Sequence, residues 1–317
     1  LIVGALLARG VALATHRRGV RVHYPLLGAA GYTGLLVWHG GLSASAPLKI
    51  TQAKDLQEIL GRTDIPPITL GDTLLSNLNI SVNLLLLVAV PLLLVAMAPS
   101  SEEEIVPIPL DGEDEAKDSS TEEEPLTPAQ RLERSPVLAW LVSALALGYL
   151  ASYLGRVGLG SADLNTINLF FLALGLALHG NARAYADAIS DGARGCAGII
   201  LQFPFYGGIM GVLALSGVMG VLATWIAQVS GPMTFAPFTF LSAGLVNLFV
   251  PSGGGQWAIQ GPLVVQSAEQ LGVPLGKAVM AFAYGDAWTN MLQPFWALPL
   301  LAITGLKARE IVGYTAA

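Results

Sequence analysis

Apolar residues gather in blocks long enough to cross a lipid bilayer, and this pattern constrains the fold of the 317-residue chain more than any other. The clearest block runs from Pro136 to Leu154, and others cover residues 166–178, 197–214 and 218–229. Charged residues make up 12% of the chain, about half of the share in a soluble domain. We therefore expect an all-α polytopic membrane protein embedded in a lipid bilayer, with a polar loop at residues 180–195.

Two apolar segments are interrupted where a membrane helix would be expected to continue. They read His39-Gly-Gly-Leu-Ser-Ala-Ser-Ala-Pro47 and Pro251-Ser-Gly-Gly-Gly-Gln-Trp-Ala-Ile-Gln-Gly-Pro262. Proline removes a backbone donor and glycine loosens the chain, so we expect no straight helix through residues 249–263. Because a broken backbone at membrane depth must line protein or a watery cavity, we predict two re-entrant hairpins, at about residues 24–60 and 235–272.

Two further membrane-length segments have polar middles. Residues 68–98 contain Asp72, and residues 274–306 contain Asp286. Each segment is predicted to be a discontinuous transmembrane helix. Acidic residues inside a membrane are functional by default, as ligands of a proton or cation, but either aspartate is equally suited to capping a half-helix. Both interpretations stay open on the sequence alone.

The formal net charge of −6 is concentrated in one segment. Residues 102–124 hold eleven acidic residues and one lysine, which leaves the rest of the chain at +4. Because residues 99–135 are also rich in proline and serine, they are predicted to form an acidic, disordered linker. The remainder has no basic patch of the kind that binds nucleic acid, so we expect no nucleic-acid partner.

The two halves of the chain can be aligned with each other. Pro25, Pro47, Gly71-Asp72 and Ser76-Asn77 recur as Pro237, Pro262, Gly285-Asp286 and Thr289-Asn290, at spacings of 212 to 215 residues. We therefore divide the chain into a first repeat (1–98), the linker (99–135) and a second repeat (136–317), and we expect it to be truncated at both ends.

Membrane topology predicts that these repeats are inverted. The basic turn at residues 16–21 places the start of the first hairpin in the cytoplasm by the positive-inside rule. Five crossings then bring the second hairpin in from the outside, which leaves the acidic linker outside and Lys307 inside. Inverted repeats with interrupted segments point to a secondary transporter with a site near the bilayer midplane.

Together with Tyr284-Gly-Asp-Ala-Trp-Thr-Asn-Met-Leu-Gln-Pro-Phe-Trp296, the two interrupted sequences resemble the short-chain fatty acid transporter family, which is grouped with the ion transporter superfamily. The resemblance covers essentially the whole chain. It implies an elevator-type fold of two inverted repeats in a bacterial cytoplasmic (inner) membrane, often as a homodimer. Sodium symporters of the superfamily carry Ser-Asn-Thr at the hairpin tips, whereas this chain has Ser43-Ala-Ser45 and Gly255-Gln-Trp257.

A small carboxylate needs donors for its oxygens and an apolar wall for its tail, and hairpin tips expose free N–H groups and positive helix ends. The residues predicted to bind the substrate are Ser43, Ser45, Ser252, Gly253, Gly254, Gly255, Gln256, Trp257, Gln260, Thr289 and Asn290. The predicted ligands of a co-transported H⁺ or Na⁺ are Asp72, Asn77, Asp286 and Asn290. No Arg or Lys occurs in the tips, so helix dipoles and the cation are expected to neutralise the anion. No cofactor and no other metal are expected.

Each of these residues also has a structural interpretation. Glycines permit close helix packing, serines bond backbone carbonyls, and tryptophans pack or anchor a helix at the membrane surface. His39 has the chemistry to carry a proton near neutral pH. A lone histidine at a hairpin is nevertheless more often a structural hydrogen-bonding group.

We therefore expect a secondary active transporter, not an enzyme, that imports acetate-, butyrate- or acetoacetate-like monocarboxylates with a cation gradient. A carrier of the same fold for another small organic anion, such as a dicarboxylate, is the alternative. A membrane-embedded enzyme would need a nucleophile–base pair or a metal cluster, and the four scattered histidines form no His-x-x-x-His pattern. A channel is the remaining possibility, because hairpins also build selectivity filters.

Overall fold

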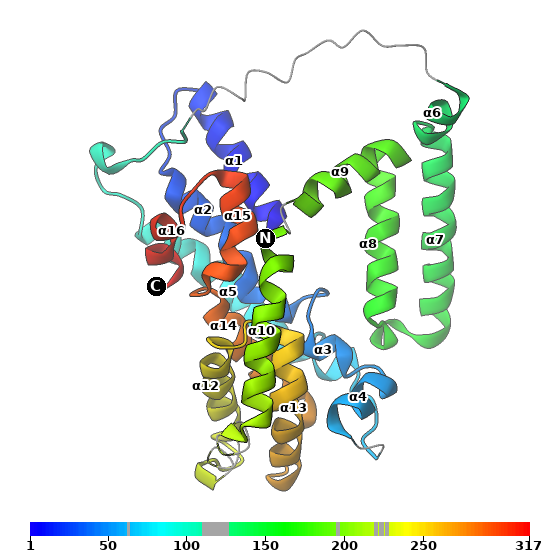
Figure 1. The fold of residues 1–317 in the computed structure, drawn as a ribbon, viewed down its shortest axis with the longest axis vertical. Helices are drawn as coiled ribbons and strands as arrows, with labels where there is room; N and C mark the ends of the chain where they lie inside the picture. The colour runs from blue at the N-terminus through cyan, green and yellow to red at the C-terminus, as the bar shows by residue number, and fades with distance from the viewer. Residues whose placement is uncertain (62–63, 110–126, 195–196, 219–220, 222–224, 226–227) are drawn as a thin grey trace.

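The computed structural model describes residues 1–61, 64–109, 127–194, 197–218, 221, 225 and 228–317, and every regular element within these ranges is helical (Figure 1). The helix expected at residues 218–229 falls largely outside the described residues. Among the described residues, two helices are long and apolar enough to cross a membrane, α5 (Asn77–Ala96) and α7 (Pro136–Val157). Only 11% and 17% of their apolar windows are buried, so both present most of their surface outward, where a bilayer would lie.

A broken helix forms the centre of the molecule. It consists of α14 (Leu275–Asn290) and α15 (Pro294–Thr304), which are separated by residues 291–293. Proline has no N–H to donate, so Pro294 is well placed at the start of a helix and poorly placed inside one. At 1.5 Å per residue the two parts together span about 45 Å, which is enough to cross a membrane. The broken segment predicted at residues 274–306 is therefore present.

A second interrupted segment runs antiparallel to this broken helix. It comprises α2 (Tyr24–Tyr32), the 3₁₀ helix η1 (Thr33–Gly40) and the short α3 (Ala46–Lys49). The register follows from hydrogen bonds that proceed in opposite directions along the two segments. Tyr24 donates to the Thr304 carbonyl at 2.7 Å, and Tyr32 donates to the Asn290 carbonyl at 2.8 Å.

The re-entrant hairpin predicted at residues 24–60 differs from what the structure shows. The first part, α2 and η1, packs into one apolar cluster with α15 and α16 (Ala308–Thr315). The later part, α3 and α4 (Ala53–Leu60), joins a different cluster with α13 (Gly253–Gln270). The chain therefore continues across the fold after the interruption, because Ile50 and Leu56 bury their side chains against α13 and not against α2.

The second hairpin, in contrast, turns back on itself. Its arms are α12 (Phe235–Asn247) and α13, and residues from Phe235 to Ser242 face residues from Gln260 to Ser267 in the antiparallel sense. No single helix runs through residues 249–263, as expected, but the break is confined to residues 248–252 and α13 continues through Pro262. Ser252 caps the helix by accepting from the Gly255 N–H, and the glycines occupy its first turn, where no intrahelical partner is lost.

The other broken segment, residues 68–98, has its interruption near its start. The 3₁₀ turn η2 (Leu70–Asp72) is followed by residues 73–76 and then by the continuous 20-residue helix α5, which Ser76 caps. The proposed repeat partners Asp72 and Asp286 lie in unlike settings, since Asp72 is exposed and Asp286 is completely buried. The structure thus does not confirm the inverted repeat.

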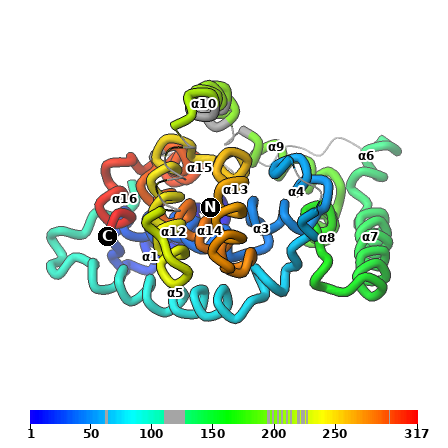
Figure 2. Tube along the Cα trace, turned by 90° about the horizontal axis from the view of Figure 1, so that it is seen from below, coloured from blue at the N-terminus to red at the C-terminus, as the bar shows by residue number. Residues whose placement is uncertain are grey.

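Three helices stand beside this body (Figure 1). They are α7, α8 (Leu164–His179) and α9 (Ala182–Arg194). The next helix, α10 (Ala197–Leu215), packs on the outside of α13 and α15 (Figure 2). The predicted loop at residues 180–195 is wrong for residues 182–194, which form α9. Asn181 accepts from the Ala184 N–H, and Arg183 pairs with Asp187 at 3.0 Å one turn later, so local capping and pairing favour the helix.

Three segments far apart in sequence meet at one end of the molecule, beyond α1 (Ile2–Arg17). They are the basic turn at residues 18–23, the start of the acidic linker and α16. Arg21 approaches Glu102 at 3.8 Å, the Val106 N–H donates to His23 Nδ1 at 3.2 Å, and His23 Nε2 lies 2.9 Å from the Tyr314 hydroxyl.

This arrangement corrects two expectations about the linker. Its beginning lies at the same end as the basic turn, whereas the charge rule and the crossing count had placed the linker on the opposite side. Ile108 is also buried in the cluster of α2 and α15, so the linker is packed at this residue where disorder was expected. Short helices, η3 (Glu102–Glu104) and α6 (Pro128–Glu133), flank the part of the linker that lies outside the described residues.

Candidate functional site

The interruptions in the helices converge at the level of Asp286 on α14. Gln293, in the break of α14–α15, donates to the carbonyls of Asn247 and Leu248 at the end of α12. Asn79, at the start of α5, donates to the carbonyls of Gly40 and Leu74, and its amide oxygen accepts from Tyr284 of α14 at 2.7 Å. Carbonyl groups left free at helix ends are thus bonded by side chains from other segments, as buried backbone requires.

A buried acid–imidazole pair lies at this level. His39 Nε2 and Asp286 Oδ2 are 2.6 Å apart, and both side chains are completely inaccessible to solvent. The backbone N–H of Ser45 donates to His39 Nδ1 at 3.3 Å, so Nδ1 carries no proton. The proton of a neutral ring must then be on Nε2, which donates to the carboxylate. With Asp286 ionised, the pair carries one negative charge, and Asp286 Oδ1 is buried with no hydrogen-bond partner among the described residues.

Neutral oxygen and amide groups surround Asp286 on the side of α12. The Asn247 amide nitrogen lies 2.9 Å from the Asp286 carbonyl, 2.9 Å from Thr289 Oγ1 and 2.8 Å from Asn290 Oδ1. Asn290 Nδ2 in turn lies 3.5 Å from Asp286 Oδ2. Of the residues predicted from the sequence, the structure brings Asp286, Thr289 and Asn290 together here. Sequence analysis missed Asn247 because an asparagine within an apolar stretch carries no local motif.

The tip of the second hairpin reaches His39 and Ser45. A Cβ atom built on Gly253 would lie 2.5 Å from His39 Cε1 and Nε2 and 3.2 Å from Ser45 Oγ, so only glycine fits there. On Gly254, a Cβ would lie 3.4 Å from Lys49 Nζ. Within the described ranges, no hydrogen bond is seen for the N–H groups of Gly253 and Gly254, which begin α13. These donors point out of a helix N-terminus, where anions are favoured.

Lys49 supplies the positive charge that the tips themselves lack. It is the last residue of α3 and is partly buried, and its ammonium group has no ion pair or hydrogen bond among the described residues. The predicted hairpin tips themselves contain no Lys or Arg. The cation was missed because Lys49 lies four residues past Ser45, and one helical turn brings it back beside the tip.

Other predicted substrate residues have structural contacts in this conformation. Gln256 donates to the Ala243 carbonyl and to Gln260, and Gln260 donates to Ser242, so both glutamines bind α13 to α12. Trp257 is completely buried in the apolar cluster of α13 and α14, where its ring meets Phe282 edge to face. Ser252 caps α13, and Gly255 donates to it.

Three of the residues predicted to bind the substrate or the cation lie far from Asp286 or are exposed to solvent. Asp72 accepts from Thr69, and its backbone carbonyl contacts Gly276, ten residues before Asp286 or about 15 Å along α14. Asn77 is exposed in the first turn of α5, and Ser43 is exposed on the loop after η1. The structure therefore does not bring Asp72 and Asn77 into contact with Asp286 and Asn290.

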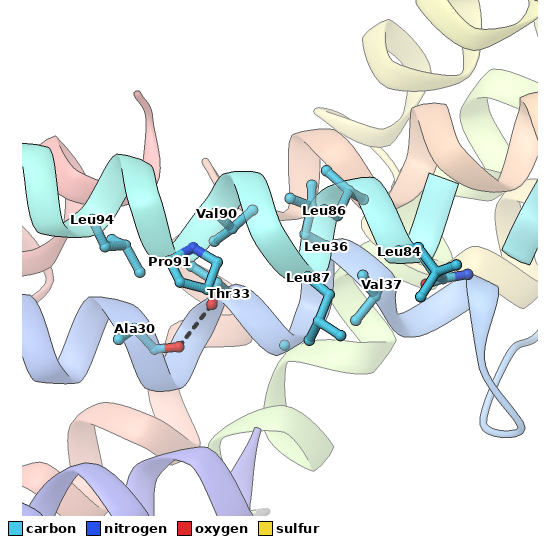
Figure 3. A pocket seen from close by; sticks show the side chains of 12 residues that line it. Ala30, Thr33, Leu36, Val37, Leu84, Leu86, Leu87, Val90, Pro91 and Leu94 are labelled. Carbon is cyan, nitrogen blue, oxygen red and sulfur yellow. Dashed lines mark hydrogen bonds between the residues drawn. The ribbon is translucent and has the colours of Figure 1, made fainter. Parts of the chain in front are cut away.

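An apolar groove lies between α2, η1 and α5 (Figure 3). It has a volume of about 480 Å³ and is lined by apolar side chains of α2, η1 and α5, with Asn83 and Thr33 as its polar members. The Thr33 hydroxyl is already bonded to the Ala30 carbonyl at 2.7 Å. A carboxylate would have no cationic partner in this groove, so it is not the candidate site.

Comparisons with known proteins identify the family of the chain. A family described as short chain fatty acid transporter matches residues 1–317. A protein of Escherichia coli K12, provisionally named a short-chain fatty acid transporter, is 44% identical over 99% of this chain and 69% of its own length. A similarly named protein of Haemophilus influenzae is 38% identical over 99% of this chain and 70% of its own.

A provisionally named basic amino acid antiporter of Escherichia coli is 31% identical, but only over 29% of this chain and 16% of its own length. No solved structure matches the chain. The family match and the first two relatives cover this chain almost completely, from the α1 helix to α16. The chain belongs to the short-chain fatty acid transporter family, and it is a membrane protein with apolar helices.

Proposed function

We propose that this chain is a secondary active transporter that imports short-chain monocarboxylates across the bacterial inner membrane with a cation gradient. The observation that carries the proposal is the ammonium group of Lys49 beside the N–H groups of Gly253 and Gly254, none of which has a partner in the part of the chain that the structure describes. These groups lie next to a buried carboxylate, Asp286, at the level where the helices are interrupted. Family membership supports the class of substrate.

The substrate carboxylate binds between Lys49 and the start of α13. Its two oxygens accept from the ammonium group and from the glycine N–H groups, while Ser45, before α3, offers a hydroxyl. A single cation matches a single carboxylate. This favours a monocarboxylate over a dicarboxylate, which would need a second positive group to replace the water around its second charge.

The coupling cation is held by the buried pair of His39 and Asp286, in which Asp286 supplies the carboxylate. Its Oδ1 atom is buried and unpartnered, and an uncompensated carboxylate inside a membrane protein favours the uptake of H⁺ or Na⁺. Asn290 lies within reach as a neutral ligand, as the sequence suggested. Alternating access by an elevator motion, an inverted-repeat relation between the halves and assembly as a homodimer remain predictions.

Uptake by proteoliposomes tests both the function and the role of Lys49. Labelled butyrate should enter faster than into protein-free liposomes, which report diffusion of the undissociated acid, and unlabelled acetate should compete where succinate does not. Replacing Lys49 by Met should raise the KM for butyrate about 10- to 100-fold, because a hydrogen bond to a charged group contributes about 1.5–3 kcal/mol.

Lys54→Met is the matched control, because Lys54 is exposed on α4 and should leave the KM unchanged. Butyrate uptake equal to that of protein-free liposomes would refute the transport function. Saturable uptake with the same KM in the Lys49 variant would keep the function and remove Lys49 from the site.

A further inference from the structure

We infer that the coupling cation is a proton, that it binds on His39 Nδ1, and that its binding releases Ser45 at the tip beside the substrate site. This inference rests on the proposed transport function and assigns its cation a specific atom. It is carried by the contacts of one imidazole ring, which joins η1, α3 and α14 in the centre of the molecule.

Both nitrogens of His39 are already engaged. Nδ1 accepts from the Ser45 N–H at 3.3 Å, and Nε2 donates to Asp286 at 2.6 Å. A backbone N–H cannot act as an acceptor, so the ring has no proton on Nδ1 in this state. A second proton on the ring can only bind at Nδ1. When it does, two N–H groups face each other, and the bond between His39 and Ser45 must break.

The charges near the ring balance when a proton and a carboxylate bind together. The His39–Asp286 pair carries one negative charge without access to water, and protonating the ring turns it into an imidazolium–carboxylate pair without net charge. Lys49 adds one positive charge beside it, and a bound monocarboxylate would cancel that charge. One proton taken up with one carboxylate therefore leaves the summed charge of these groups unchanged at zero.

Of the described groups that face His39 from other elements, Lys49 carries the one further charge, and the rest are uncharged. Trp38 stacks on the ring at 4.3 Å, Gly253 of α13 lies against it, and Asn79 of α5 bonds the next residue, Gly40. Among the described residues that contact this cluster, the other titratable groups are Tyr284 of α14 and Lys49 of α3. Tyr284 donates to Asn79 and is not bonded to the ring.

Release of Ser45 would act directly on the substrate site. Ser45 is the residue before α3, and both its backbone N–H and its hydroxyl lie against the ring and Gly253. Lys49 N–H donates to the Ser45 carbonyl, so a shift of Ser45 moves the lysine as well. Protonation of one atom thereby changes the position of the cation that holds the carboxylate.

Calorimetry of the purified full chain tests the inference. Potassium butyrate is titrated at pH 7 in two sodium-free buffers that differ in ionisation enthalpy, and the difference in binding heat counts the protons taken up. The wild-type protein should take up close to one proton per butyrate. His39→Gln keeps a donor for Asp286 but binds no proton, so it should bind butyrate with little or no proton uptake.

His179→Gln, an exposed histidine on α8, is the control and should behave as wild type. Asp286→Asn is the second variant in case His39→Gln does not fold, and it should also lose proton uptake. Wild-type binding without proton uptake, or binding that requires sodium, would overturn the proton inference and leave the transport proposal standing. No butyrate binding by the wild type would overturn both.

Discussion

At the scale of single residues, environment decides which of several similar side chains has a functional role. Asp72 and Asp286 are both preceded by glycine and followed by asparagine within a few residues, yet one is exposed and the other is completely buried. Exposure allows water to solvate Asp72, whereas Asp286 depends on His39 for its hydrogen bond. The two lysines also differ in exposure, since Lys54 is exposed to solvent and Lys49 is partly buried beside Gly254.

A second histidine, His23, is predicted to stabilise the end of the molecule that carries the basic turn in a pH-dependent way. Burial lowers the pKa of His23, an effect that nearby Glu104 partly opposes. The fold therefore favours the neutral ring, whose Nδ1 accepts from Val106. This contribution to stability is present above the unfolded pKa of about 6.5 and is lost as the pH falls below it. Thermal unfolding of wild type and His23→Asn should differ at pH 8 and converge towards pH 5. A difference that does not change with pH would contradict this role.

At the scale of helices, close contact between α12 and α14 holds the site together. Gly244 and Gly285 allow the two backbones to approach, and Asn247 of α12 then reaches the Asp286 carbonyl. The positions of the breaks follow from capping. Ser252 and Ser76 each cap a helix that the apolar pattern alone would have extended, and Gln293 and Tyr32 bond the carbonyls left free at helix ends.

Gly285→Ala should destabilise this contact. A methyl group there would collide with the Phe240 carbonyl oxygen and the Ala243 side chain, and such overpacking costs about 1–3 kcal/mol of folding free energy. Gly148→Ala on α7 is the control, because nothing lies within 4 Å of the added atom and alanine favours a helix. The apparent melting temperature in detergent should fall for the first variant and not for the second. Equal melting temperatures would show that α12 and α14 can separate freely.

At the scale of the whole molecule, two interrupted segments cross the fold in opposite directions and one hairpin enters beside them. The end of the molecule that carries the basic turn also carries the start of the linker and α16. The turn between α13 and α14 lies at the other end of the broken helix, about 45 Å away at a rise of about 1.5 Å per residue. The positive-inside rule assigns the basic end to the cytoplasm.

Labelling of single cysteines in a Cys196→Ser background tests this topology. Cysteines at Glu103 and Arg309 should resist a membrane-impermeant maleimide in intact cells and react after permeabilisation. A cysteine at Gln270, which is exposed near the end of α13, should react in intact cells. Reaction at Glu103 in intact cells would restore the linker to the outside, as the crossing count had suggested.

The sequence by itself determined the class of the protein, its family and the break between α14 and α15, because apolar block length and proline act locally. It also led to Asp286, Asn290 and the Gly253–Gly255 tip as site candidates, which remain to be tested. Only the tertiary structure decided that residues 24–60 cross the fold, that Lys49 lies beside the tip and that His39 pairs with Asp286. These depend on packing between segments up to 247 residues apart, and no local pattern encodes which side chain is buried against which.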